Sequence, residues 1–482
     1  MTSDAPLLTL SVSLIGTEPE IWRRLEVDGS MPLPRFHEVL QSAMGWTNSH
    51  LHSFADRNPF EARRGTLAIV ARNWFDADSL DEGLEGFDEA EETVAGALGY
   101  GDGKLWYEYD FGDRWMHVIT ELSRRPRSAG DPEARVLGGL RRAPLEDCGG
   151  IGGWAEVLRV WADRHDIRTR AALDGKDEDV DGPAFRLAWI EGMTAFGEDF
   201  DPEDFDVDTA NVDLRLWHPG TPGAVVATHR AGRWIADLDD WGRHDFGRAL
   251  HRAGIDPFGQ RLPAGLPTAG AGVVAPYQWL IRTCQEQEGL SLTPNGNLTE
   301  AGVARVLDEL GWRDHDTVWR GGKRENTARI VAMLRESALG AGLVRKAGRI
   351  LVATAAGRKE ADRPGALWQR LADRVLPGRL AQDRVDVGML DLLVTVVDPE
   401  APQDDLLKAI ARGMDMLGYA GPGGGPLEHF RFIRYVEQLY ATRTVLETTV
   451  TEGGAGHALH RGWGSPERRA LRLDFARAAL QA

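Results

Sequence analysis

The sequence contains little cysteine: Cys148 and Cys284 are the two among 482 residues. So few thiols fit a reducing compartment, and the absence of a Cys-x-x-Cys pair argues against a zinc ribbon. No apolar run reaches the roughly 18 residues of a membrane span. The start, Met-Thr-Ser-Asp-Ala-Pro, lacks the basic and then apolar pattern of a signal peptide. We therefore expect a cytoplasmic protein with no membrane partner.

Familiar catalytic motifs are also missing. The sequence has no Gly-x-x-x-x-Gly-Lys-Ser/Thr phosphate loop, no Gly-x-Ser-x-Gly elbow and no His-Glu-x-x-His helix. A serine-resolvase mechanism needs a nucleophilic serine among several arginines. Ser11 and Ser13, with Arg23 and Arg24, do not make a convincing version of that arrangement.

Acidic residues outnumber basic ones, 74 to 56, which gives a net charge of −18. Such a protein repels the phosphate backbone of nucleic acids at long range. The charge is uneven, however: residues 76–92 hold nine acidic and no basic side chains, whereas residues 320–375 are comparatively basic. Any contact with DNA is therefore expected in the C-terminal half.

The chain is too long for a single core, and its patterns change along the sequence. Strand and helix periodicities mix in the first part, glycine and proline then become frequent, and helical patterns dominate the rest. The pattern predicts an α+β protein with four parts: an α+β domain over 1–215, a Gly/Pro-rich linker region with a short helix near 244–253 over 216–275, a winged-helix-like domain over 276–375, and a helical domain over 376–482.

Particular elements can be placed from periodicity. In the first domain we expect strands at 7–15, 21–27 and 49–55, one or two strands within 105–122, and helices at 34–44 and 154–164. In the last domain we expect helices at 387–397, 403–417, 428–440 and 466–481.

The region 299–360 follows the order of a winged helix-turn-helix. Thr299 is a plausible N-cap for a helix over 300–310, a second helix is expected at 325–339, and two apolar stretches then flank a basic glycine turn at Lys346-Ala-Gly348. We expect Leu343, Ile350 and Val352 to pack on the helices. The DNA-binding candidates are Arg345, Lys346 and Arg349. The alternative is a helical domain whose basic side chains are merely solvated, or a fold that contacts protein.

The segment Tyr107–His117 is the most unusual stretch, with four aromatic residues, two aspartates and one histidine in eleven positions. Tyr107, Tyr109 and Phe111 alternate as one face of a strand does. In one interpretation the strand end presents Asp110, Asp113 and His117 to a ligand. In the other, the aspartates bond turn amides and the rings belong to the core.

Two further groups could carry chemistry. His50 and His52 would share a face of a strand, and Asp113 or His117 from a neighbouring strand could complete a divalent-metal site. The alternative is polar surface or satisfied core histidines.

Glu146, Asp147 and Cys148 precede a glycine pair. Cys148 could be a nucleophile if His117 or His165 lay near it, but the two carboxylates oppose a thiolate. The alternative is a tight turn with Cys148 as filler.

Five segments together resemble a known family: Ile21-Trp-Arg-Arg24, Met44-Gly-Trp-Thr-Asn-Ser-His-Leu-His-Ser-Phe54, Tyr109-Asp-Phe-Gly-Asp-Arg-Trp-Met-His117, Pro144-Leu-Glu-Asp-Cys-Gly-Gly150 and Phe200-Asp-Pro-Glu-Asp-Phe-Asp206. In this order they are similar to the plasmid pRiA4b ORF-3-like family, over roughly residues 5–215. The resemblance implies a fold and a setting on plasmids and insertion sequences, where members are labelled resolvase-like. It implies no particular reaction. Arg114 departs from the acidic residue usual at that position.

Three functions remain open. The first is a non-enzymatic accessory protein of a mobile element or defence locus, with a ligand- or partner-binding first domain and a C-terminal half that contacts DNA. The second is a metal-dependent hydrolase or nuclease centred on Tyr109-Asp-Phe-Gly-Asp113. The third is a protein-interaction scaffold. The first requires no cofactor, and the second requires a divalent metal.

Overall fold

The computed structural model describes residues 5–59, 71–174, 182–193, 200–216, 228–238, 240–259, 261, 265–286, 289–315, 317–318, 322–376, 380–420, 437–450 and 466–482. The chain forms two compact units. Unit 1 comprises Met1–Ala224 with Asp239–Arg248, and unit 2 comprises Val225–Leu238 with Ala249–Ala482. The four-part division expected from composition stays a prediction.

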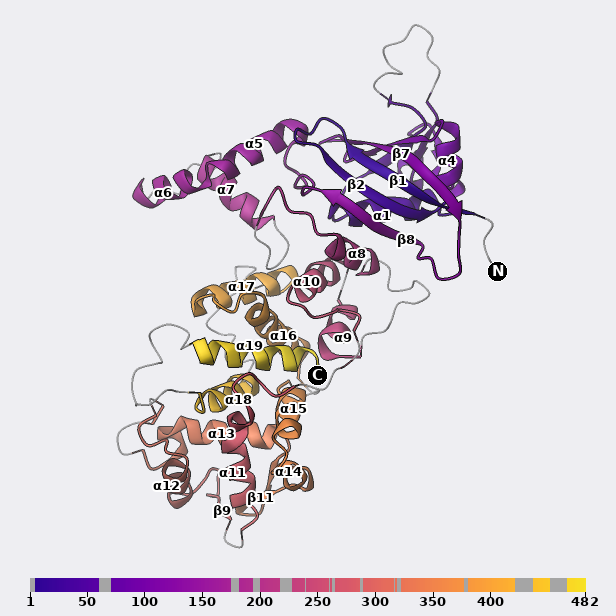
Figure 1. The fold of residues 1–482 in the computed structure, drawn as a ribbon. Helices are drawn as coiled ribbons and strands as arrows, with labels where there is room; N and C mark the ends of the chain where they lie inside the picture. Colours follow the sequence, from indigo (N-terminus) through magenta and orange to yellow (C-terminus); the bar gives the residue numbers. More distant parts are fainter. Residues whose placement is uncertain are drawn as a thin grey trace. The chain divides into compact units, whose positions relative to one another are not determined.

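Unit 1 is built on an eight-stranded sheet with the order β5-β4-β3-β6-β7-β1-β2-β8 (Figure 1). All neighbouring pairs are antiparallel except β4 with β5. The strands are β1 (Pro6–Leu14), β2 (Ile21–Asp28), β3 (His52–Ala55), β4 (Asn73–Phe75), β5 (Phe87–Asp88), β6 (Lys104–Tyr109), β7 (Trp115–Pro126) and β8 (Ala134–Leu140).

Helices complete unit 1: α1 (Leu33–Met44), α3 (Ala77–Asp81), η1 (Glu89–Glu91), α4 (Val94–Tyr100), α5 (Gly150–Ala162), α6 (Arg164–Asp174), α7 (Pro183–Gly192) and α8 (Val207–Leu216), while α10 (Asp240–Arg252) contributes residues to both units. Helix α1 shares one buried core with the sheet, and its Phe36 ring lies 6.0 Å from that of Phe54 on β3. Sheet and helices together confirm the α+β class.

The aromatic segment lies in the middle of this sheet. Strand β6 ends at Tyr109, the chain turns, and β7 begins at Trp115, which is fully buried. Tyr107 and Tyr109 are buried as well. They point to one side of the sheet because side chains two apart on a strand share a face. The rings of Tyr107, Tyr109 and Trp115 are therefore core. The expected place of Phe111 on the same strand face is wrong, because β6 ends at Tyr109 and the Phe111 ring is exposed in the turn. Only this turn between the strands is available to a ligand.

Helix α5 starts four residues earlier than periodicity suggested. Its first turn is rich in glycine, and a Cβ on Gly153 would lie 1.7 Å from the carbonyl oxygen of Cys148. Only glycine fits that approach. The glycines therefore permit the helix to begin directly after the Asp147 loop.

Strand β8 was not expected from the sequence. It forms one edge of the sheet, and the side chain of Asn211 on α8 covers it. The Asn211 amide accepts a hydrogen bond from the Val136 nitrogen and donates one to the Val136 oxygen, both at 2.9 Å. The side chain thereby satisfies the backbone groups that an edge strand would leave open.

Unit 2 is mainly helical: α9 (Arg230–Ala236), η2 (Ala271–Val274), α11 (Ala275–Thr283), α12 (Glu300–Glu309), η3 (Glu325–Thr327), α13 (Arg329–Gly340), α14 (Ala355–Glu360), α15 (Pro364–Arg374), α16 (Gln382–Val397), α17 (Gln403–Met416), α18 (Glu437–Glu447) and α19 (Pro466–Leu480). Helices expected near 244–253, 300–310, 325–339, 387–397, 403–417 and 466–481 are confirmed. The helix expected at 428–440 lies mostly outside the described residues. Among the described residues, no helix is long and apolar enough to cross a membrane.

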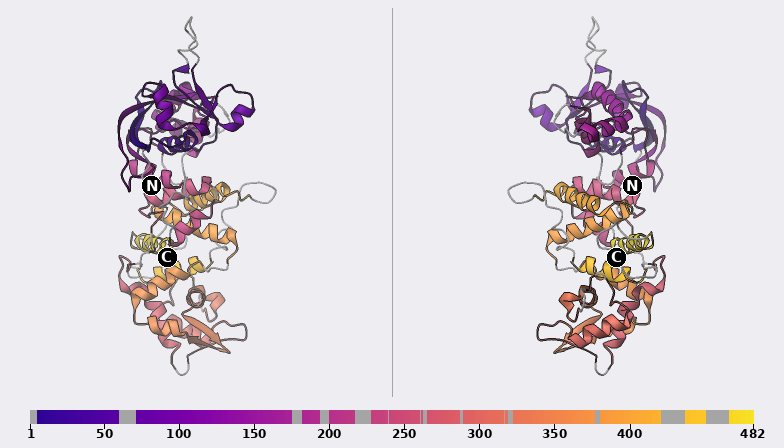
Figure 2. Two further views of the ribbon diagram at one scale, coloured as in Figure 1. Left: turned by 90° about the vertical axis from the view of Figure 1, so that its right-hand side faces the viewer. Right: turned by 90° about the vertical axis from the view of Figure 1, so that its left-hand side faces the viewer.

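A small sheet, with the order β10-β11-β9, accompanies α11 to α13 (Figure 2). Its strands are β9 (Leu290–Ser291), β10 (Val344–Ala347) and β11 (Ile350–Ala353). The hairpin between β10 and β11 turns at Gly348, whose φ of 61° favours glycine.

The expected inward face of β11 is wrong. Ile350 is exposed and Val352 only half-buried, whereas Leu351 and Ala353 are buried. Strand β11 begins directly after Gly348-Arg349, so the inward positions fall one residue later than we expected. A shift of one position exchanges the two faces of a strand. Leu343 is buried as expected.

Candidate functional site

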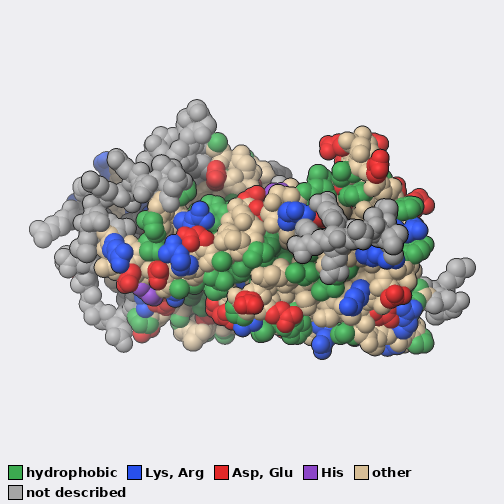
Figure 3. Space-filling view, turned by 90° about the horizontal axis from the view of Figure 1, so that it is seen from above, with side chains coloured by type: hydrophobic (Ala, Val, Ile, Leu, Met, Phe, Trp, Pro, Cys, Tyr) green, Lys and Arg blue, Asp and Glu red, His purple; other side chains and the backbone are tan. Residues whose placement is uncertain are grey.

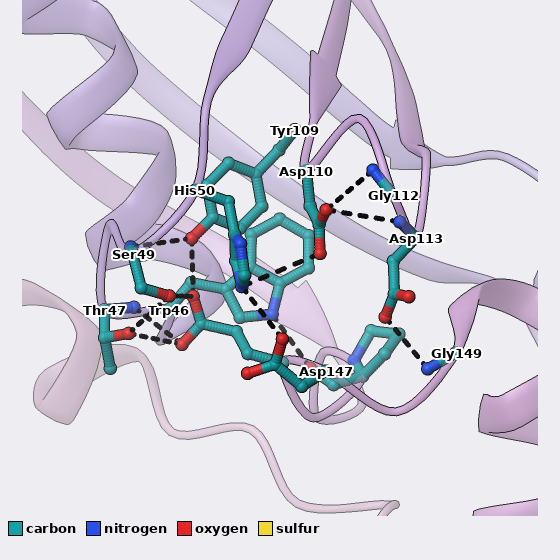
Figure 4. Close-up of polar contacts among 12 residues, drawn as sticks. Trp46, Thr47, Ser49, His50, Tyr109, Asp110, Gly112, Asp113, Asp147 and Gly149 are labelled. Atoms are coloured by element: carbon teal, nitrogen blue, oxygen red, sulfur yellow. Dashed lines mark hydrogen bonds and ion pairs between the residues drawn. The ribbon is translucent and has the colours of Figure 1, made fainter.

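The turn between β6 and β7 carries Asp110. Its backbone has a φ of 59°, in the left-handed region, and its side chain is nearly buried. One carboxylate oxygen, Oδ1, accepts hydrogen bonds from the backbone nitrogens of Gly112 at 2.9 Å and Asp113 at 3.2 Å (Figure 4). The other oxygen, Oδ2, faces His50. Asp110 therefore organises the turn and still presents one oxygen outward.

His50 stands between two carboxylates. Its Nε2 atom lies 3.7 Å from Oδ2 of Asp110 and 3.3 Å from Oδ1 of Asp147. This nitrogen is shielded from solvent and makes no hydrogen bond within the described part of the chain. The three side chains offer one ligand atom each, all within 4.8 Å of one another.

Asp147 comes from the loop that precedes α5. Its φ is 59°, and its side chain is 66% exposed, against 9% for that of Asp110. Nearby, Oδ2 of Asp113 accepts a hydrogen bond from the Gly149 nitrogen at 3.0 Å. Asp113 is thus occupied in joining two loops and does not belong to the group around His50.

Glu146 fastens the loop that carries His50. One oxygen, Oε2, accepts from the nitrogen of Thr47 at 3.0 Å and from its hydroxyl at 2.5 Å. The other, Oε1, accepts from the hydroxyls of Ser49 at 3.2 Å and Tyr109 at 2.5 Å. With four hydrogen bonds to protein, Glu146 is a structural tie and not a free ligand.

Residues other than glycine with a positive φ are concentrated around His50, Asp110 and Asp147. Six non-glycine residues among those described have a positive φ, and four of them surround the site: Asn48, Asp110, Arg114 and Asp147. Each such conformation costs of order 1 kcal/mol, and conformations of this kind cluster at functional sites. Four of the six positive-φ residues thus lie in the loops and the turn that carry the candidate site.

The expected pairing of His50 with His52 is wrong. Strand β3 begins only at His52, so His50 lies in the preceding loop. His52 is buried, stacks on His37 with ring centroids 3.5 Å apart, and bonds Glu89 at 2.9 Å. Its polar atoms are thus directed to the core.

His117 is also interior. Its ring is fully buried, its Nδ1 lies 3.3 Å from the Tyr107 carbonyl oxygen, and burial lowers the pKa of His117 to about 4. The fold therefore separates His52 and His117 from the group around His50.

Cys148 is suited to packing. It is buried, and burial, together with the charges of Asp113 and Asp147, raises the pKa of its thiol to about 12. A thiolate at neutral pH is the requirement for a nucleophile, so the geometry favours the filler interpretation.

The residues around His50 fit a divalent cation. One imidazole and two carboxylates suit ions such as Mn²⁺ and Zn²⁺. Ligand atoms about 2.1 Å from one ion lie about 3–4 Å apart, and the two distances from His50 fall in that range. Sequence reasoning named all three residues within a larger set of candidates, and it assigned no role at the site to Ser49 or Tyr109.

The DNA-binding candidates lie in unit 2. Arg345, Lys346 and Arg349 are exposed on the β10–β11 hairpin, and no carboxylate among the described residues forms an ion pair with them. The hairpin is thus a cationic projection on an acidic protein.

The fold and site define a mixed α+β domain that carries a group of metal-ligand type at the turn between two central strands. The family model of the plasmid pRiA4b ORF-3-like protein matches residues 6–209. An uncharacterised protein of Sinorhizobium fredii, y4hQ, is 33% identical over 172 residues, which cover 33% of this chain and 75% of the relative. The chain belongs to the plasmid pRiA4b ORF-3-like family.

A solved protein of unknown function from Methanosarcina mazei Go1 is also similar, with 25% sequence identity and a TM-score of 0.32. The match covers 43% of this chain and 98% of that protein.

Proposed function

We propose that unit 1 is a cation-dependent ligand-binding module, with His50, Asp110 and Asp147 as the ligands of one divalent ion. The observation that carries the proposal is the solvent-shielded Nε2 of His50, which has no hydrogen bond and lies between two carboxylates. A buried polar atom without a hydrogen bond is costly. A bound cation would satisfy it.

Three protein ligands leave coordination positions open. In such sites the ion holds water or an oxygen of a bound molecule. The module would therefore serve an accessory protein of a mobile element or defence locus by taking an anionic ligand through the ion. The same positions would suit a hydrolase, in which the ion lowers the pKa of bound water. A metal-dependent activity lost in His50→Ala would favour the hydrolase.

Calorimetric titration of the full chain with Mn²⁺ and with Zn²⁺ tests the site. We expect one ion per chain, and at least a tenfold weaker affinity in His50→Ala and in Asp147→Asn, because each variant removes one of three ligands. His165→Ala, an exposed histidine on α6, is the control and should bind like the wild type. Wild-type protein that binds neither ion would end the proposal.

We propose, as a second function, that the β10–β11 hairpin contacts duplex DNA. Two observations support it. The elements α11, β9, α12, α13, β10 and β11 follow the chain order and strand pairing of a winged helix-turn-helix. The hairpin also carries three cations without acidic partners among the described residues. An interaction scaffold, with no DNA contact, is the remaining alternative.

Charge reversal tests the hairpin. We expect Arg345→Glu combined with Lys346→Glu to weaken binding to any duplex alike and to flatten its salt dependence, because phosphate contacts carry no sequence information. Fluorescence anisotropy at several salt concentrations measures both effects. The control, Arg24→Glu with Lys104→Glu in unit 1, changes the net charge equally. Equal losses in both double variants would leave only the overall charge as the cause. No duplex binding at low salt would remove DNA from the account.

A further inference from the structure

Each of the three proposed ligands is preceded in the chain by a polar residue, and these three preceding residues are hydrogen-bonded to one another. The pairs are Ser49-His50, Tyr109-Asp110 and Glu146-Asp147. The first members of the pairs are hydrogen-bonded to one another. The second members offer ligand atoms that all lie within 4.8 Å of one another (Figure 4). The two groups of three therefore come from the same three backbone segments.

The inner group is a closed set of hydrogen bonds. The Tyr109 hydroxyl donates to Oε1 of Glu146 at 2.5 Å and accepts from the Ser49 nitrogen at 3.1 Å. The Ser49 hydroxyl donates to the same Glu146 oxygen at 3.2 Å. Of the three residues, Tyr109 lies on a central strand, β6. Its hydroxyl therefore connects the loops of Ser49 and Glu146 to the sheet.

Further contacts make this frame stiff. The Trp46 indole nitrogen donates to the Pro144 oxygen at 2.8 Å, and the Trp46 ring stacks on that of Tyr109 with centroids 4.9 Å apart. Thr47 bonds Glu146 through both its nitrogen and its hydroxyl. The loops before His50 and before Asp147 are thus joined to each other as well as to β6.

We propose that Tyr109 is a positioning residue of the cation site, whose hydroxyl sets the spacing of His50, Asp110 and Asp147 through Ser49 and Glu146. The inference rests on the proposed cation function. It names a residue that does not touch the ion and that acts through the ligands' chain neighbours.

Physical chemistry requires such a frame here. Asp110 and Asp147 bring two negative charges to one point, and both have left-handed backbones that persist only where the surroundings determine them. Hydrogen bonds behind the ligands commonly orient metal sites, and their loss costs about 10–100-fold in affinity.

A matched pair of variants separates positioning from stability. Tyr109→Phe removes the hub hydroxyl and keeps the ring. The control is Tyr107→Phe, two residues earlier on the same strand, whose buried hydroxyl bonds His37 at 2.8 Å and Gln41 at 2.9 Å instead. We expect both variants to lower the melting temperature of the metal-free protein, because each loses hydrogen bonds in the core.

Only Tyr109→Phe should change the site. We expect its affinity for Mn²⁺ to fall about 10–100-fold and the visible spectrum of bound Co²⁺ to shift, with both unchanged in Tyr107→Phe. Wild-type affinity in Tyr109→Phe, or equal losses in both variants, would overturn the positioning role and leave the cation proposal intact. Wild-type protein that binds no ion would overturn both. If Tyr109→Phe does not fold, Glu146→Gln decides by the same criteria.

Discussion

Two histidines in the unit 1 core are held neutral by burial. Burial, followed by the neighbouring His52, lowers the pKa of His37 to about 3, and burial lowers that of His117 to about 4. His37 bonds the Tyr107 hydroxyl at 2.8 Å and the Asn48 side chain at 2.6 Å. Each ring therefore stays neutral in the folded state at pH values where an exposed imidazole is charged.

We expect unit 1 to lose stability as the pH falls below about 6.5. Below this pH the two histidines bind protons in the unfolded chain but stay neutral in the folded state. The free energy of unfolding therefore falls by up to about 1.4 kcal/mol per pH unit for each histidine, until the pH reaches the pKa of the folded state. Above pH 6.5 this contribution is complete. Urea unfolding followed by hydrogen exchange in β6 and β7 measures the slope. His37→Gln should make it shallower, and the exposed His165→Gln should not. A slope unchanged in His37→Gln would contradict this account.

At the scale of elements, the side chain of Asn211 on helix α8 hydrogen-bonds the backbone of the edge strand β8. Asn211 pairs with both backbone groups of Val136 and also donates to the Val207 oxygen at 2.9 Å. Leu137 and Leu140 on the same strand are exposed. An open edge with apolar side chains promotes pairing between molecules, so the amide protects the sheet.

We expect Asn211→Ala to destabilise unit 1 by about 1–3 kcal/mol, because the Val136 nitrogen loses its partner, and to increase association at high protein concentration. Denaturant unfolding and light scattering measure the two effects. Asp208→Asn, an exposed position on the same helix, is the control. A monomeric, equally stable Asn211→Ala protein would show that α8 covers the edge without this amide.

Elements with strong local patterns were predictable. The alternation in β1 and β2, the apolar spacing of α1, and the aromatic residues of β6 and β7 gave their positions within a few residues. Strand β8 was missed because its sequence, Ala134–Leu140, contains two glycines and weak alternation. Its conformation depends on pairing with β2 and on Asn211, and neither contact is local in sequence.

At the scale of the whole molecule, the candidate site shows what sequence order hides. His50, Asp110 and Asp147 were all visible as candidates, but they lie far apart along the chain and meet only through the fold. Local reasoning instead grouped His50 with His52, two positions away. To separate the two histidines, one has to know that β3 begins only at His52 and that the buried His52 ring bonds Glu89.

The net charge of −18 affects how the protein could approach nucleic acid. On the face drawn in Figure 3, acidic and basic side chains are scattered among hydrophobic ones across the described residues. A long-range field would thus come from the sum of charges and would oppose DNA. The β10–β11 hairpin would therefore attract DNA only at short range. The association rate with DNA would rise with salt concentration, because salt screens the long-range repulsion.

The unequal exposure of the two aspartates sets how an ion would come and go. Asp110 is fixed in its turn, whereas two-thirds of the Asp147 side chain faces solvent. An ion would therefore enter and leave past the exposed Asp147 side chain, without opening of the sheet, and we expect its exchange to be fast. Occupancy would then follow the free ion concentration of the surroundings from moment to moment. Such a site works as a gauge of cation supply, in contrast to a centre loaded once during folding and retained for the lifetime of the protein.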